Sequence, residues 1–157
     1  MKHFNLPKVG HRLTRKLLLL TGALLLLHGL QGQTWCPGEV AKALASDGAA
    51  SDEFGRSVSI SGDRAIVGAW GDDDNGGLSG SAYIFERDGS GNWVQVAKLL
   101  ASDGAAGDEF GWFVSISGDR AIVGASKNAD NGSSSGSAYI FERDGNGNWS
   151  EVAKLLA

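Results

Sequence analysis

A long internal repeat constrains this chain more than any other feature of its sequence. Residues 41–96 align without gaps with residues 97–152, so the repeat is 56 residues long, and 43 of the 56 positions are identical. A third copy begins at residues 153–157. A repeat of this length predicts structural units that stack on one another, because each unit carries an apolar face that it cannot bury alone.

Each copy contains four short segments with the pattern of β-strands. The first alternates apolar and polar side chains, and the second is a continuous apolar run, which is typical of a strand covered on both faces. Segments rich in Gly, Asp and Asn separate them, as in hairpin turns. The apolar segments are residues 58–60, 65–69, 81–87 and 93–100 in the first copy, and 114–116, 121–125, 137–143 and 149–156 in the second.

Four antiparallel strands at this period are typical of one blade of a β-propeller. A sandwich of eight strands is the alternative, but it would not require two nearly identical halves. We therefore predict an all-β fold, two four-stranded antiparallel blades of an incomplete β-propeller. Blade 1 is expected at residues 41–96, and blade 2, with the start of a third copy, at residues 97–157.

Two blades alone would leave apolar faces open to solvent, because known propellers close with about four to eight blades. Three interpretations follow from the sequence. The chain is a fragment whose further blades belong to a longer protein, a homo-oligomer that completes a ring from identical copies, or a product without a stable fold. Three copies would supply about six blades and four copies about eight.

The N-terminal segment has the organisation of a secretory signal peptide. Five basic residues and no acidic residue lie in residues 1–16, and residues 17–30 are almost wholly apolar. We predict a signal helix in residues 1–32 and a linker in residues 33–40. An uncleaved membrane anchor is the alternative, although an apolar run of 14 residues is shorter than the roughly 20 that span a bilayer. The protein is thus expected to be secreted or held in the cell envelope, touching a membrane only through this segment.

The composition after residue 32 excludes several partners and reactions. That part has 9 basic and 18 acidic residues, whereas nucleic acids and anionic lipids require clustered Lys or Arg. All three histidines lie before residue 32, and Cys36 is the one cysteine. Ser-His-Asp and Cys-His catalysis, His-ligated zinc and an intrachain disulfide are therefore excluded.

Three short motifs recur in phase in the two copies. They are Phe54-Gly55, Val67-Gly68-Ala69 and the run 80–85 in the first copy, and Phe110-Gly111, Val123-Gly124-Ala125 and the run 136–141 in the second. These motifs resemble the FG-GAP repeat, the blade unit of integrin α-subunit propellers and of many bacterial surface proteins. The resemblance covers Glu39 to the end of the chain, although Trp70 and Ser126 stand where the GAP element has its Pro. It implies a non-catalytic module that binds through loops on one propeller face.

Calcium is the cofactor that the resemblance brings into question. Several family units bind Ca²⁺ on an Asp-rich loop between the FG and GAP strands, but here that interval is only residues 61–64 and 117–120. One carboxylate cannot supply the about six to eight oxygens that Ca²⁺ takes. A second acidic segment offers Asp72, Asp74 and Asn75 as Ca²⁺ ligands. The alternative is a solvated turn, in which Asp and Asn accept backbone hydrogen bonds.

The acidic pairs in the link before each blade are candidates for catalytic groups. A glycosidase needs two carboxyl groups about 5–10 Å apart, and Asp52-Glu53 and Asp108-Glu109 supply candidate pairs. Because the same pair recurs in each copy, whereas an active site normally occurs once in a propeller, we expect these residues to cap and turn the link, with Phe54 and Phe110 buried beside them.

Positions that differ between the copies point to a contact surface. Trp70, Trp112 and Phe113 replace polar residues of the other copy, and exposed aromatic side chains suit a binding site. Neutral drift after duplication explains the same differences. The leading hypothesis is an exported module that binds a protein or a surface glycan and is not an enzyme. An architectural repeat of a large envelope or adhesin protein is second, and a glycan-acting propeller enzyme third.

Overall fold

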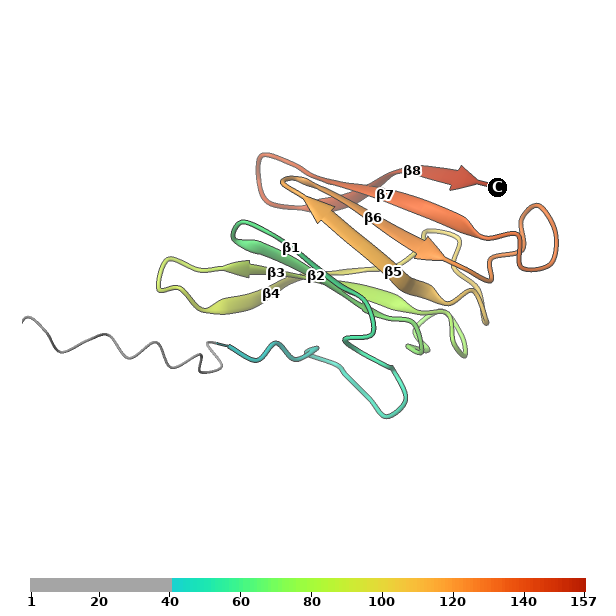
Figure 1. The fold of residues 1–157 in the computed structure, drawn as a ribbon, viewed down its shortest axis with the longest axis horizontal. Coiled ribbons are helices and arrows are strands. Elements are labelled where there is room, and N and C mark those ends of the chain that lie inside the picture. Colours follow the sequence, from blue (N-terminus) through green and yellow to red (C-terminus); the bar gives the residue numbers. More distant parts are fainter. Residues whose placement is uncertain (1–40) are drawn as a thin grey trace, which may run out of the picture. The chain divides into compact units, whose positions relative to one another are not determined.

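The computed structural model describes residues 41–157, which form eight β-strands (Figure 1). The predicted signal helix and linker lie outside the described residues. Within residues 41–157 no helix is long or apolar enough to cross a membrane. The strands are β1 (Val58–Ser61), β2 (Arg64–Ala69), β3 (Ser81–Arg87), β4 (Trp93–Leu99), β5 (Phe110–Ser117), β6 (Arg120–Ala125), β7 (Ser137–Arg143) and β8 (Trp149–Leu156).

The strands form two four-stranded antiparallel sheets with the orders β1-β2-β3-β4 and β5-β6-β7-β8. Each sheet is a simple meander of strands adjacent in sequence, as the turn residues predict. In the β1–β2 hairpin Ser61 pairs with Arg64, and Gly62 takes the positive φ of 59° that this turn needs. The predicted all-β fold of two four-stranded blades is confirmed, and the sheets are called blade 1 and blade 2 below.

Strand β5 begins at Phe110 and not at Val114, where the alternating pattern begins. The register of β5 against β6 shifts between Phe110 and Phe113. Phe110 also forms a parallel bridge with Gly80 of blade 1. The start of β5 is therefore fixed by blade 1 as well as by its own sheet.

The two blades pack face to face, and the surface between them is called the seam. Blade 1 contributes Ile66, Ile84 and Leu99, and blade 2 contributes Val123 and Tyr139, among others, to one buried cluster. All five side chains are at most 3% exposed. At about 25 cal/mol per Å² of apolar surface removed from water, a seam of this kind is a main source of stability.

Backbone groups of β5 also bond directly to side chains of β1. The amides of Val114 and Ile116 on β5, and of Gly118 just after it, donate to serine hydroxyl oxygens on or next to β1 at 3.0, 3.3 and 3.2 Å. Those serines are Ser57, Ser59 and Ser61. Because β5 is an edge strand, these amides would otherwise have no protein partner.

Candidate functional site

The predicted acidic segment folds around an ammonium group. Lys98 Nζ lies 3.0 Å from Asp72 Oδ2, 2.7 Å from Asp74 Oδ2 and 2.8 Å from Asp47 Oδ2. Asp72 is buried, and Asp47 and Asp74 are about half exposed. Two of the predicted Ca²⁺ ligands, Asp72 and Asp74, are thus brought together, with an ammonium between them. Asn75 does not join them at the ammonium, and its backbone N–H donates to Ser79 Oγ at 3.0 Å.

The buried side chain of Tyr83 also belongs to this cluster. Its hydroxyl lies 2.9 Å from Asp47 Oδ1 and 3.1 Å from Asp72 Oδ2, and its single proton is donated to one of them at a time. Burial raises the pKa of Tyr83 to about 12. The hydrogen bond from Lys98 holds the pKa of Asp47 below its usual range. Burial alone would raise the pKa of Asp72, but its hydrogen bonds with Lys98 and the Asp74 amide lower it.

The ammonium responds in the opposite direction. Burial alone would lower the pKa of Lys98, but its three carboxylate partners raise it above the ordinary lysine value. Both sides of the cluster are therefore charged at neutral pH. Lys98, its three carboxylates and Tyr83 are called the blade 1 clamp below. It joins the segment before β1, which carries Asp47, to the β2–β3 loop and β4.

Blade 2 repeats the clamp with one charge fewer. Lys154 pairs with Asp103 and Asp130, and Tyr139 donates to Asp103 Oδ1 at 2.9 Å. Asn128 occupies the position equivalent to Asp72, and it accepts a hydrogen bond from Ser137 Oγ at 2.7 Å. The substitution changes the number of carboxylates around the ammonium from three to two, which makes the two blades a matched pair for experiment.

The aromatic residues singled out from the sequence occupy two different surfaces. Trp70 and Trp112 pack edge to face across the seam with ring centroids 4.8 Å apart, and the Arg56 guanidinium lies 4.5 Å above the Trp112 ring. Trp70 Nε1 is buried without a hydrogen-bond partner within the described part of the chain. Phe113 is separate from this group and is 65% exposed.

The acidic pairs of the links make turn contacts. Asp52 Oδ2 accepts a hydrogen bond from the Ala49 amide at 2.6 Å, and Asp108 Oδ2 accepts one from the Ala105 amide at 3.0 Å. Phe110 is fully buried beside its link, as expected, but Phe54 is only partly buried, because no preceding blade within the described residues covers it. These contacts support the interpretation that the pairs turn the chain between blades.

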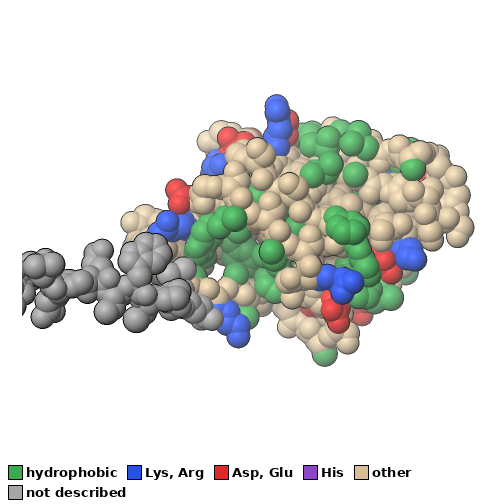
Figure 2. All heavy atoms as spheres, in the orientation of Figure 1, with side chains coloured by type: hydrophobic (Ala, Val, Ile, Leu, Met, Phe, Trp, Pro, Cys, Tyr) green, Lys and Arg blue, Asp and Glu red, His purple; other side chains and the backbone are tan. Residues whose placement is uncertain are grey.

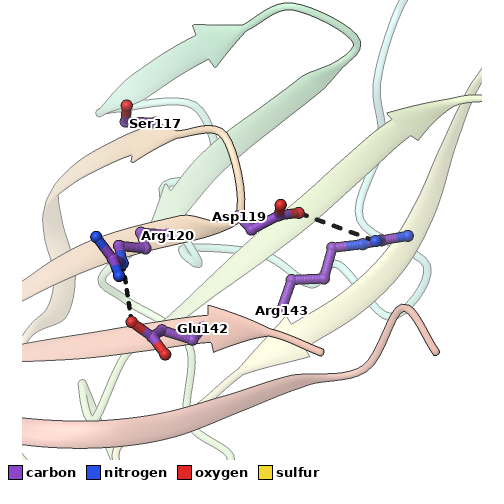
Figure 3. Close-up of a pocket in the computed structure, with 5 residues that line it drawn as sticks. All are labelled: Ser117, Asp119, Arg120, Glu142 and Arg143. Atoms are coloured by element: carbon purple, nitrogen blue, oxygen red, sulfur yellow. Dashed lines mark hydrogen bonds and ion pairs between the residues drawn. The ribbon is translucent and has the colours of Figure 1, made fainter. Parts of the chain in front are cut away.

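A charged hollow of about 400 Å³ lies at the turn between β5 and β6, at the end of blade 2 away from the Lys154 clamp (Figure 3). Arg120 Nε pairs with Glu142 Oε1 at 2.8 Å, and Arg143 Nη1 lies 3.9 Å from Asp119 Oδ1. Ser117 lines the same hollow. Each charged side chain that lines the hollow has an oppositely charged partner among the others.

Residues 37–85 and 93–141 each match the model of the FG-GAP repeat. Together these segments cover more than half of the chain. The chain belongs to the FG-GAP repeat family. No curated protein matches the sequence.

The loop on which other FG-GAP units bind Ca²⁺ does not fit the ion in this FG-GAP chain. The β1–β2 turn is too short to wrap a cation, and its one carboxylate, Asp63, faces Arg87 Nη1 at 3.5 Å. The binding of Ca²⁺ at Asp72, Asp74 and Asn75 stays a prediction. An ion at that place would have to displace the ammonium of Lys98, which already satisfies three carboxylates.

The lysines of the two clamps were missed in the sequence of this FG-GAP protein. Lys98 lies in the fourth strand among apolar residues, where it resembles an ordinary solvent-facing position. One signal could have revealed it, since Lys42, Lys98 and Lys154 recur at one position of the repeat in an otherwise apolar run.

Proposed function

We propose that this chain is a non-catalytic, exported FG-GAP module that binds a protein or a surface glycan through the loop end of its blades. The loop end consists of the β2–β3 loop, the β6–β7 loop and the link between blades, residues 70–80, 126–136 and 100–109. It also includes Trp112, which packs on Trp70, and Arg56, which lies over Trp112. Export is supported by the signal-like N-terminal segment and by the occurrence of FG-GAP units in cell-surface proteins. The balanced ion pairs and the lack of histidine after residue 32 support a role without catalysis.

The observation that carries the proposal is the group formed by Trp70, Trp112 and Arg56. Tryptophan and arginine are the residues most enriched among those that dominate binding energy at protein interfaces. The two rings meet at the seam, where both blades would contribute to one contact surface.

Two substitutions test this group with residues that the repeat itself tolerates. Trp70→Ser introduces the residue that blade 2 has at the equivalent position, and Trp112→Arg introduces the residue of blade 1. Val94→Ser, at the hairpin end of β4, is the matched control because blade 2 has Ser150 there. The probes are an array of defined glycans and a set of purified extracellular-matrix proteins.

We expect one class of probe to bind the unaltered protein and the Val94→Ser control equally, and to bind both Trp variants at least tenfold more weakly. Equal binding by all four proteins would contradict the proposal that the loop end binds the ligand. The absence of binding to every probe would favour the architectural hypothesis. Cleavage of any glycan would favour the hypothesis of a glycan-acting propeller enzyme.

A further inference from the structure

The outward face of blade 2 repeats the face that blade 1 buries in the seam. Ile122 is equivalent to Ile66 and Leu155 to Leu99, because each pair is separated by one repeat. The seam residues Ile66 and Leu99 are 0% and 3% exposed, whereas Ile122 and Leu155 are 40% and 49% exposed. This outward face is called the blade 2 free face.

The outward face of blade 1 repeats the complementary side of the seam. Ile60 is equivalent to Ile116, and their exposed fractions are 66% and 6%. An apolar hollow of about 190 Å³ opens on this surface, which is called the blade 1 free face. The hollow is lined by Ala41, Ala43, Ile60, Ala65, Val67, Phe85 and Trp93. Figure 2 shows hydrophobic side chains at the surface over both blades.

Hydrogen-bonding groups recur on the free faces together with the apolar ones. Ser115 and Ser117 on β5 are equivalent to Ser59 and Ser61, whose hydroxyls accept bonds from amides across the seam. The amides of Ile60 on β1 and of Gly62 just after it are equivalent to those donors. At the third position Phe113 replaces the serine, so this position offers apolar surface in place of an acceptor.

Two glycines that allow the blades to touch in the seam have equivalent glycines on the free faces. In the seam, a Cβ on Gly68 would lie 2.0 Å from the carbonyl oxygen of Gly111, so both residues allow the backbones to touch. Their equivalents are Gly124 and Gly55. Gly55 has φ 96° against 90° for Gly111, although a Cβ there would meet nothing within 4 Å. Gly55 on the blade 1 free face therefore has the backbone conformation of Gly111 in the seam, and Gly124 on the blade 2 free face has no Cβ to prevent a close approach.

The charges at the hairpin end are complementary in the same sense. Across the seam, Arg143 Nε lies 2.9 Å from Glu86 Oε1, and Arg64 Nη1 lies 3.1 Å from Asp119 Oδ1. One repeat later, Glu142 and Arg120 line the open hollow of Figure 3. Their counterparts on the blade 1 free face are Arg87 and Asp63, which line a second hollow. Opposite charges would therefore meet if the two free faces joined.

We propose that the blade 2 free face binds the blade 1 free face of a second copy of this chain, head to tail, in the geometry of the seam. Ile122 of one copy then packs against Ile60 of the next, and Glu142 pairs with Arg87 of that copy. Two unlike faces make a heterologous contact, which closes into a ring when the rotation per copy allows it. Closed propellers have about four to eight blades, which corresponds to about two to four copies.

A short segment of the chain competes for the same position. Ala43 and Ala45 pack on the blade 1 free face at the positions equivalent to Leu99 and Ala101 in the seam. The end of β8 in the second copy would lie there. We expect residues 41–45 to yield, because Leu155 is hydrogen-bonded into the sheet beside Ala138 and covers more apolar surface than Ala43, which lies in no strand.

Complementation between two variants tests this arrangement. The protein is expressed from its full-length sequence and purified in whatever processed form the host leaves, and its mass is measured by size exclusion with light scattering. Ile122→Asp and Ile60→Asp each spoil one free face at an exposed position, so both variants should fold, which circular dichroism checks. Each variant alone should be a monomer. An equimolar mixture should give a species of two chains, because each variant supplies the face that the other lacks.

Two further variants separate a specific contact from general stickiness. Gly124→Ala adds a methyl group with no close neighbour inside one chain, since the nearest atom would lie 3.7 Å away. It should leave the thermal unfolding of the single chain unchanged and weaken association at least tenfold. Ala43→Asp should strengthen association, because it loosens the competing segment.

We expect the unaltered protein to form a discrete complex. Ile122→Asp and Ile60→Asp should each abolish association, and mixing the two variants should restore it. A monomer of the unaltered protein at 100 μM, association that survives Ile122→Asp, or a mixture that stays monomeric would each overturn the proposal. None of these results depends on ligand binding at the loop end, so the proposed function stands or falls separately.

Discussion

Replacing Lys98 with Met removes the ammonium of the blade 1 clamp and leaves its carboxylates facing one another. The side chain of Lys98 is 16% exposed and that of Asp72 only 5% exposed. Removing one partner of a buried ion pair costs about 3–5 kcal/mol. The exposed partners, Asp47 and Asp74, add less than about 1 kcal/mol each. We therefore expect Lys98→Met to lower the free energy of unfolding by about 3–5 kcal/mol at pH 7.

The blade 2 clamp supplies the matched control. Within residues 41–157, Lys154 is paired only with Asp103 and Asp130, which are 46% and 41% exposed, and Asn128 replaces the buried carboxylate. Lys154→Met should cost about 1–2 kcal/mol, the sum of two exposed ion pairs. Urea unfolding followed by tryptophan fluorescence, at one protein concentration, measures both losses.

Acid should reduce the difference between Lys98→Met and the unaltered protein. The pKa values of Asp47 and Asp72 are lowered in the folded protein. A lowered carboxyl pKa contributes stability above the unfolded value of about 4, and that contribution is lost as the pH falls further. Adding Asp72→Asn to Lys98→Met should recover about 1–3 kcal/mol at pH 7. Equal losses in the two Lys variants, or a loss that is the same at pH 7 and pH 3, would refute the clamp.

Three other outcomes follow from the described contacts. Gly68→Ala should lower the free energy of unfolding by about 1–3 kcal/mol in a urea titration, because its methyl group would overlap the seam, whereas Gly124→Ala should change it little. Burial raises the pKa of Tyr83 and Tyr139 to about 12, so stability should fall as the pH rises from about 10 to 12, where tyrosinate absorbance reports ionisation. Added Ca²⁺ should raise the melting temperature of the Lys98→Met variant more than that of its blade 2 counterpart, since three carboxylates surround the site in place of two.

Local patterns were enough to predict the strands of this protein. Alternation and turn chemistry act within a few residues, so β3 and β7 have the predicted bounds. The start of β5 could not be predicted in this way, because the bridge of Phe110 to Gly80 is made across the seam. Its position depends on a neighbouring sheet and not on the order of residues in the strand.

The contacts of the clamp and of the Trp70–Trp112–Arg56 group could not be predicted from the sequence. Asp47, Asp72 and Asp74 reach Lys98 from segments far apart in the chain, and only the folded sheet brings them together. Trp70 and Trp112 attracted notice because they differ between the copies. Their contact could not be predicted, because it arises from stacking one repeat on the next.

The central claim is that the two repeats are consecutive blades joined by a seam, and amide hydrogen exchange of β5 tests it most directly. The Val114 and Ile116 amides lie on the edge of their own sheet and, among the described residues, are bonded only to serine hydroxyls of the first repeat. We predict that they exchange slowly, while the equivalent Val58 and Ile60 amides of β1 exchange quickly in dilute protein. Fast exchange at Val114 and Ile116 would mean that the blades do not pack together, and would contradict this account.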